Sequence, residues 1–218
     1  MNTAAGIAVT GAQIFNGLSA DNRDAVEFEK MTLDACLTHP TPFGLYHYHS
    51  WSPCILKRYK QTSKTRSPGT CRGDRSCWRN PIQYNEDGWT STRNFGGMVG
   101  MAKDGHPIYG PYNEYGELWL CSEHDICNGR FFKNGSYGYV STNTHPYMVG
   151  CWGPAAYQKH DHTCSSYACP SGSHVRSGSR KKATRRKKNS KSGFKDRAGT
   201  FVSNRDDTYG GRGPWGPR

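Results

Sequence analysis

The chain has 218 residues, enough for one large domain or two small ones, and 34% of them are hydrophobic. No apolar stretch reaches the length of a membrane-spanning helix. The formal net charge of +12 is typical of a nucleic-acid-binding protein, but residues 174–218 hold fourteen Lys and Arg against three Asp. This tail carries +11 of the net charge, so the composition excludes a strongly basic body.

The N-terminal third of the chain predicts short elements separated by turns. Residues 6–17 contain two apolar runs around a glycine and end in Asn-Gly, which predicts a β-hairpin. Residues 24–37 are the best helical candidate, with a strand as the alternative. Residues 39–44 contain two prolines and a glycine and predict a turn that leads into the next strand.

That next strand combines aromatic and imidazole side chains. Residues 44–50, Gly-Leu-Tyr-His-Tyr-His-Ser, alternate with the period of a β-strand. A strand places Tyr46 and Tyr48 on one face and His47 and His49 on the other. Because tyrosine forms strands well and buries its ring, we expect the tyrosine face to point to the core. The two imidazoles, one pleat repeat apart, can then reach one metal ion.

An internal repeat relates the first half of the chain to a later part. The pattern Gly-x-Ala-x-x-Gly-x-x-Ile-aromatic occurs at residues 6–15 and again at 100–109. Six further identities share one constant offset: Asp34, Cys36, Gly44, Tyr46, Tyr48 and Ser50 match Asp125, Cys127, Gly135, Tyr137, Tyr139 and Ser141. A coincidence of turn-rich composition is the alternative to a duplicated unit.

These patterns predict a mainly β fold with one short helix, arranged as a single domain of two pseudo-repeated halves. The domain is expected at residues 6–155, with halves at about 6–55 and 99–155. Residues 57–80 are polar and basic, and we interpret them as a surface insertion. Residues 156–170 are expected to form a Cys/His-rich extension.

The nine cysteines include no Cys-x-x-Cys pair, which favours disulfides and an oxidising compartment. Cysteines flank the Tyr-His-Tyr-His strand and its repeat, so equivalent bonds are expected there. The predicted bonds are Cys36–Cys54, Cys127–Cys151, Cys71–Cys77 and Cys164–Cys169, which leaves Cys121 unpaired or bonded to a cysteine of the longer precursor. The N-terminus has no secretory signal pattern. We expect an exported protein whose chain begins inside a longer precursor, with a nuclear protein as the alternative.

Three histidines, His39, His47 and His49, occur only in the first half of the repeat. Their counterparts in the second half are Arg130, Gly138 and Val140. Such a difference is typical of a site added to a duplicated scaffold. Imidazole ligands suit copper or zinc. The alternative is that these are ordinary strand and turn histidines that only hold the fold.

Other residues could belong to such a metal site. They are His106 and His145 as additional ligands, with Asp34, Asp104, Tyr46 and Tyr48 in the surrounding shell. A carboxylate can orient an imidazole, although Asp is more often a turn cap. Nearby tyrosines and an oxidising exterior favour copper slightly over zinc. No nucleophile motif indicates hydrolysis, but an open three-histidine site could activate water, so a metal-dependent enzyme remains an alternative.

Several of these motifs occur together in one known family. They are Asp34-x-Cys36-x-x-His39, Tyr46-His47-Tyr48-His49, Asp104-Gly-x-Pro-Ile-Tyr-Gly110, Cys127-Asn-Gly-Arg130, Pro146-Tyr147 and Cys151-Trp152-Gly153. In this order they resemble the YHYH domain family over residues 6–155. The resemblance implies an exported protein, because family members are typically exported, and it implies no assigned activity.

The C-terminal tail, residues 171–218, has the composition of a disordered segment. Its basic run is Arg180, Lys181, Lys182, Arg185, Arg186, Lys187 and Lys188. Such a run binds polyanions, which here could be acidic glycans, extracellular matrix or nucleic acid. A structural or matrix protein without a metal is therefore the main alternative to a metal-binding function.

Overall fold

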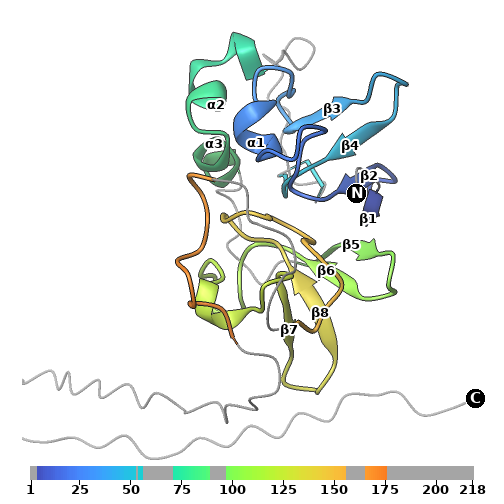
Figure 1. Cartoon of the computed structure of the whole chain (residues 1–218), viewed down its shortest axis with the longest axis vertical. Coiled ribbons are helices and arrows are strands. Elements are labelled where there is room, and N and C mark those ends of the chain that lie inside the picture. Colours follow the sequence, from blue (N-terminus) through green and yellow to red (C-terminus); the bar gives the residue numbers. More distant parts are fainter. Residues whose placement is uncertain (1–3, 53, 56–70, 89–96, 156–164, 176–218) are drawn as a thin grey trace, which may run out of the picture. The chain divides into compact units, whose positions relative to one another are not determined.

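The computed structural model describes residues 4–52, 54–55, 71–88, 97–155 and 165–175, all within one compact unit, Met1–Ser179. Its strands are β1 (Ala4–Ala8), β2 (Gln13–Phe15), β3 (Thr38–Pro40), β4 (Tyr46–Tyr48), β5 (Met98–Ala102), β6 (Pro107–Tyr109), β7 (Gly129–Phe131) and β8 (Tyr137–Val140). Its helices are α1 (Ala25–Phe28), α2 (Arg75–Arg79) and α3 (Pro81–Gly88), with 3₁₀ turns η1 (Cys71–Gly73) and η2 (Cys121–Glu123). The protein is mainly β (Figure 1). In the described ranges no helix has the length and apolar character needed to span a membrane.

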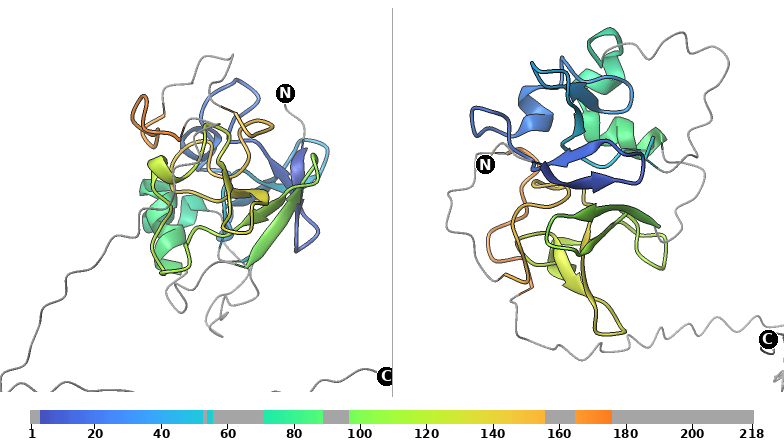
Figure 2. Two further views of the ribbon diagram at one scale, coloured as in Figure 1. Left: turned by 90° about the horizontal axis from the view of Figure 1, so that it is seen from below. Right: turned by 90° about the vertical axis from the view of Figure 1, so that its right-hand side faces the viewer.

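One sheet contains all eight strands, in the order β3-β4-β2-β1-β5-β6-β8-β7. The order consists of two matching sets of four strands, which meet where β1 pairs antiparallel with β5. Each set has an antiparallel hairpin, then a parallel pair, then a second antiparallel hairpin. The blue hairpin β1–β2 lies beside the green hairpin β5–β6 (Figure 2). This symmetry supports the proposed duplication of residues 6–55 and 99–155.

The junction between the two sets explains a repeated glycine. Gly6 in β1 and Gly100 in β5 occupy the same position of the repeat, and each faces the other strand's backbone. A Cβ atom at Gly100 would lie 2.6 Å from the carbonyl oxygen of Ile7. Only glycine allows this close approach of the two strands.

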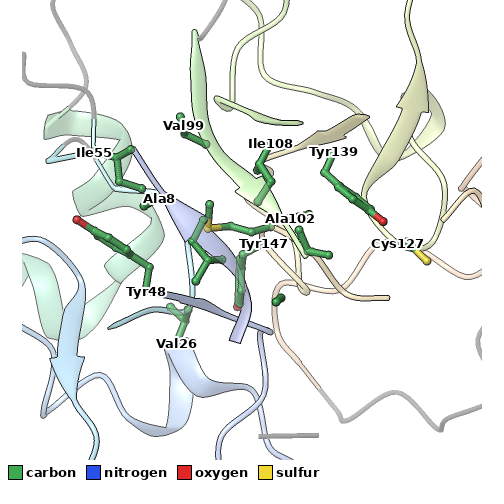
Figure 3. Close-up of a cluster of buried hydrophobic side chains, with 14 of the residues drawn as sticks. Ala8, Val26, Tyr48, Ile55, Val99, Ala102, Ile108, Cys127, Tyr139 and Tyr147 are labelled. Carbon is green, nitrogen blue, oxygen red and sulfur yellow. The ribbon is translucent and has the colours of Figure 1, made fainter. Parts of the chain in front are cut away.

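The main core lies around the central strands. Ile14 of β2 and Ile108 of β6, which are equivalent in the repeat, are both fully buried. Other buried side chains gather around β1 and β5, including Ala8, Val99 and Ala102 (Figure 3). The apolar face of the sheet therefore supplies the hydrophobic stabilisation that the short strands need.

The expected helix at 24–37 is much shorter than predicted. Asp24 caps α1 by accepting from the backbone of Val26 at 2.9 Å, and the helix ends at Phe28. Asp34 then accepts from the backbone N–H groups of Cys36 at 2.8 Å and Thr38 at 3.1 Å. An aspartate that bonds the backbone two residues on stabilises a turn rather than a helix. The chain accordingly enters β3, a strand that the sequence analysis placed in a turn.

The segment interpreted as a surface insertion is partly internal. Residues 56–70 lie outside the described residues, but Cys71 and Cys77 are buried and pack with Leu33 and Leu37 in a small second core. Helices α2 and α3 come after Cys71, so the described part of the mainly β fold has three short helices where one was expected. The segment packs onto the first half because Cys71 and Cys77 contact Leu33 and Leu37, and the backbone N–H of Cys71 donates to the carbonyl oxygen of Leu33. The Cys71–Cys77 bond closes only a small loop within the segment.

Four disulfides join described cysteines. Three match the expected pairs: Cys36–Cys54, Cys71–Cys77 and Cys127–Cys151. The fourth joins Cys121 to Cys169, so the expected Cys164–Cys169 bond is wrong and Cys121 is not unpaired. Local spacing could not reveal this bond, because its cysteines are 48 residues apart. Residues 165–175 thereby return to the domain, where Ser166 N–H donates to Glu27 Oε1 at 3.1 Å.

Candidate metal centre

The β3–β4 hairpin places the three histidines together. His39 lies directly opposite His47 in the register, and His49 follows His47 on the same face of the strand. The ring centroids are 4.5 Å apart for His39 and His47, 4.7 Å for His47 and His49, and 5.3 Å for His39 and His49. One ligand atom from each ring lies within 4.8 Å of the other two. These residues are called the histidine cluster below.

The histidine face of β4 is buried, although the tyrosine face was the one expected to point to the core. His39, His47 and His49 are only 8%, 3% and 4% exposed. Tyr48 packs in the core, but Tyr46 is 43% exposed. Phe15 of β2 covers the cluster and stacks on His47, with ring centroids 4.1 Å apart. The cluster is therefore an internal polar site with an apolar wall.

Two backbone carbonyls fix the tautomers of His47 and His49. The Nδ1 atom of His47 lies 3.1 Å from the carbonyl oxygen of Leu45, and that of His49 lies 2.7 Å from the carbonyl oxygen of Asn16. A carbonyl oxygen only accepts, so both Nδ1 atoms carry the proton. Both Nε2 atoms then present lone pairs, and they lie 2.9 Å apart.

Thr32 fixes the third tautomer. Its hydroxyl donates to the carbonyl oxygen of Glu29 at 2.8 Å, and its Oγ1 atom lies 2.8 Å from Nδ1 of His39. Because the hydroxyl proton is already used, Oγ1 accepts from the Nδ1–H group of His39. All three imidazoles thus keep Nε2 available, which is the arrangement that outer hydrogen bonds impose on metal-binding histidines.

Glu29 lies next to the cluster. It follows the end of α1, and its Oε2 atom lies 3.5 Å from Nε2 of His39 and 3.4 Å from Nε2 of His49. Oε2 and the Nε2 atom of His39 are both buried without a hydrogen-bond partner. The sequence analysis missed Glu29, because only the early end of the helix brings it over the hairpin.

Burial controls the charges of these groups. It lowers the pKa of His39 to about 4 and that of His49 to about 3, with repulsion from neighbouring imidazoles as a smaller cause. Burial also lowers the pKa of His47, and it raises the pKa of Glu29, to which Asp21 adds. The imidazoles are therefore neutral at physiological pH, which is the form that binds metal ions.

A comparison with protein families agrees with the motif in β4. The model of the family described as "YHYH protein" matches residues 1–118. The chain belongs to the YHYH family. The YHYH match includes Glu29 and the histidine cluster, and it ends before β7, whereas the motifs resemble the family as far as residue 155. No curated protein and no solved structure matches the chain.

In this YHYH protein, the residues expected around the site have other partners. Asp34 caps its turn and binds the hydroxyl of Tyr46. The hydroxyl of Tyr48 lies 3.5 Å from Oγ1 of Thr10. The expectation that Asp34, Tyr46 and Tyr48 surround a metal ion is therefore not supported by their contacts. Besides Glu29 and Phe15, groups that contact the cluster include two backbone carbonyls and the Thr32 hydroxyl, which no sequence pattern marks.

The remaining candidates lie with the second half or the extension. Asp104 binds the hydroxyl of Tyr139, and its Oδ2 atom lies 3.2 Å from Nδ1 of His106. His145 packs edge-on against Tyr147, and its backbone N–H donates to Tyr167. Neither histidine belongs to the cluster.

The equivalent position of the second half has a different chemistry. Arg130 lies opposite Gly138 in the β7–β8 register, where the first half has His39 opposite His47. Its guanidinium stacks over Trp119 at 4.3 Å from the ring centroid, and Nη1 lies 3.9 Å from Glu123. At equivalent positions, the first half therefore has a pair of imidazoles and the second half has an arginine in a cation–π contact with Trp119.

Proposed function

We propose that this YHYH protein binds one divalent transition-metal ion through the Nε2 atoms of His39, His47 and His49. One observation carries the proposal: three buried imidazoles have their protons fixed on Nδ1, beside a buried carboxylate oxygen that has no hydrogen-bond partner. Neutral imidazole nitrogens held by outer hydrogen bonds are the usual nitrogen ligands of zinc and copper.

Energetics favour a metal site over a purely structural role. Buried acceptors that face one another without a donor destabilise a fold, because they lose water and gain no hydrogen bond. The Nε2 atoms of His47 and His49 are 2.9 Å apart, and Oε2 of Glu29 lies 3.4 Å from the latter. A cation at this point would turn each unfavourable contact into a favourable one.

Zinc is the metal that we propose first, and copper is the competitor. Of the two grounds for preferring copper, the oxidising exterior remains, but the nearby tyrosines Tyr46 and Tyr48 bind Asp34 and Thr10 instead. Three histidines with one open position are typical of zinc sites at which water or a substrate completes the tetrahedron. Asp104, His106 and His145 have no part in this proposal.

Calorimetric titration of the chelator-treated full chain with Zn²⁺ and with Cu²⁺ tests the proposal. We expect about one equivalent to bind to the wild type, with release of few protons because the ligands are already neutral. The matched control is His106→Ala, which removes a partly exposed histidine outside the cluster. Equal loss of binding in His106→Ala and His49→Ala, or no binding to the wild type, would contradict the proposal.

Glu29 favours a second candidate function, metal-dependent hydrolysis. Its carboxylate lies 3.4 Å from a ligand atom of the cluster and its pKa is raised by burial, as is common for a general base that takes a proton from water. Zinc-saturated wild type is expected to hydrolyse at least one of a panel of nitrophenyl carboxylate and phosphate esters, and Glu29→Gln is expected not to. If neither the wild type nor Glu29→Gln hydrolyses any ester, the hydrolytic function is contradicted and only metal binding remains proposed.

We further propose that the protein works in an oxidising compartment, as an exported protein. Four disulfides among the described residues support this, since such bonds are rare in reducing compartments. The basic run at 180–188 lies outside the described residues. Its binding to acidic glycans, matrix or nucleic acid therefore stays a prediction.

A further inference from the structure

A second cluster of metal-ligating groups lies in the other half of the protein. Cys121 begins η2, His124 follows this turn, and Cys169 belongs to the segment 165–175 that returns to the domain. One ligand atom from each of the three lies within 4.8 Å of the other two. The two sulfur atoms are joined as a disulfide.

His124 has the features of a prepared ligand. It is fully buried, and its Nδ1 atom lies 3.0 Å from the carbonyl oxygen of Asp125, so Nδ1 carries the proton. Its Nε2 atom is buried without a hydrogen-bond partner. Burial lowers its pKa to about 4, so the ring is neutral. The disulfide explains why the cysteines are close, but it gives no reason for a buried, unpartnered imidazole nitrogen beside them.

We propose that Cys121, His124 and Cys169 form a zinc site that replaces the Cys121–Cys169 disulfide under reducing conditions. Two thiolates and an imidazole are a common ligand set for zinc. Two thiolates on a tetrahedral zinc ion lie about 3.8 Å apart. Cysteines whose Cα atoms are 5.8 Å apart can reach that separation by rotation of their side chains. The ring of His174 packs edge-on against His124 at 5.2 Å, which places a second imidazole near the remaining position.

Replacement of the disulfide by zinc requires a two-electron reductant, and a dithiol can supply the electrons. The dithiol gives two electrons and two protons to the Cys121–Cys169 bond and becomes a disulfide itself. The two thiols then lose their protons to solvent as their sulfur atoms bind Zn²⁺. His124 binds through Nε2 without losing a proton.

Exchange of the disulfide for a zinc ion would affect how the segment 165–175 is held on the domain. This segment bonds to α1 through Ser166 and Glu27, and Glu29, which follows α1 directly, lies beside the histidine cluster. Either the disulfide or the zinc ion can hold Cys169 against η2. The segment would therefore keep its place on the domain in both oxidising and reducing surroundings.

Alkylation mapped by peptide mass spectrometry tests the inference on the full chain. The protein is reduced with a phosphine, which contributes no thiol, and then treated with iodoacetamide with and without Zn²⁺. Alkylation of Cys121 and Cys169 is expected to be at least about tenfold slower with zinc, because bound thiolates are poor nucleophiles. Cys36 and Cys127, which no zinc ligand set includes, are expected to react at unchanged rates.

The variant His124→Gln is expected to lose the protection, and His106→Ala to keep it. Near-ultraviolet circular dichroism of the oxidised variants shows whether each has folded before reduction. If His124→Gln does not fold, Co²⁺ binding to the reduced wild type decides instead, through a thiolate-to-cobalt absorption band that alkylation of Cys121 and Cys169 removes. Zinc protection that is absent, equal at all cysteines or retained in folded His124→Gln would overturn the inference. Because the readout follows thiols, failure here is distinct from failure of the histidine cluster to bind metal.

Discussion

The Oε2 atom of Glu29 lies 3.4 Å from the Nε2 atom of His49, and both atoms are acceptors when Glu29 is ionised and His49 is neutral. The proton of His49 is held on Nδ1 by the carbonyl oxygen of Asn16. No proton therefore lies between the two acceptors when Glu29 is ionised. Burial raises the pKa of Glu29, to which the nearby Asp21 carboxylate adds, and burial lowers the pKa of His49. These shifts and this contact together predict how the metal-free protein responds to pH and mutation.

The metal-free protein should become less stable as the pH falls below 6.5. The unfolded chain protonates its histidines near pH 6.5, whereas folded His39 and His49 protonate only at about 4 and about 3. Between these values the unfolded state binds more protons, so stability is complete above pH 6.5 and decreases toward pH 4. Each histidine contributes a slope of up to about 1.4 kcal/mol per pH unit. Urea unfolding at a series of pH values measures this slope, and a flat profile would contradict the buried neutral cluster.

Replacing Glu29 by glutamine should have opposite effects on the metal-free and metal-bound protein. Without metal, Glu29→Gln is expected to raise the melting temperature slightly, because it removes a partly buried carboxylate whose ionisation is disfavoured by burial. With metal, it is expected to lower affinity about 10- to 100-fold, since a nearby anion stabilises the cation. Thermal unfolding with and without zinc measures both effects. The control is Glu117→Gln, which changes an exposed residue. If Glu29→Gln binds metal as tightly as this control, Glu29 does not contribute to the site.

Thr32 should position His39 without binding the metal. Thr32→Val keeps the shape of the side chain but removes the oxygen that accepts from Nδ1 of His39. We expect a fall in metal affinity of about tenfold and a recovery in Thr32→Ser, which restores the hydroxyl. Zinc titration of both variants provides the measurement. If the serine variant binds as weakly as the valine variant, the hydroxyl has no such role.

Much of the first half could be predicted from its sequence, because the relevant signals are local. The alternation at 46–49 placed His47 and His49 on one face, and that face carries the histidine cluster. Position 39 was singled out because its repeat counterpart is Arg130 rather than histidine. The contact of His39 with His47 requires a β3–β4 register, however, and two prolines hid β3 within a turn.

Two of the features that sequence reasoning missed depend on contacts between segments that are apart in the chain. Glu29 reaches the cluster only because α1 ends at Phe28, after a single turn. Cys121 finds Cys169 only because the segment after 165 returns to the domain. Hydrophobic periodicity within residues 24–37 or within residues 165–175 does not predict these contacts.

Asp34 and its repeat counterpart Asp125 should stabilise the fold and leave the metal site intact. Asp34 accepts from two backbone N–H groups of its turn, and Asp125 accepts from Cys127 and Gly129, both at 2.9 Å. Asp34→Asn is expected to lower the free energy of unfolding by about 1–3 kcal/mol, because charged acceptors form stronger hydrogen bonds than amides. Chemical unfolding measures the loss. If folded Asp34→Asn binds fewer metal ions than the wild type, Asp34 contributes to the metal site and the account of its role is wrong.

The most direct test of the histidine cluster is the metal content of the purified full chain, measured by mass spectrometry of the elements. Wild type is compared with His47→Ala/His49→Ala and with His106→Ala, all prepared without an affinity tag that binds metals. We predict about one equivalent of zinc or copper in the wild type and in His106→Ala, and none in the double variant. A folded wild type that contains no metal and takes up neither ion on dialysis would contradict the account.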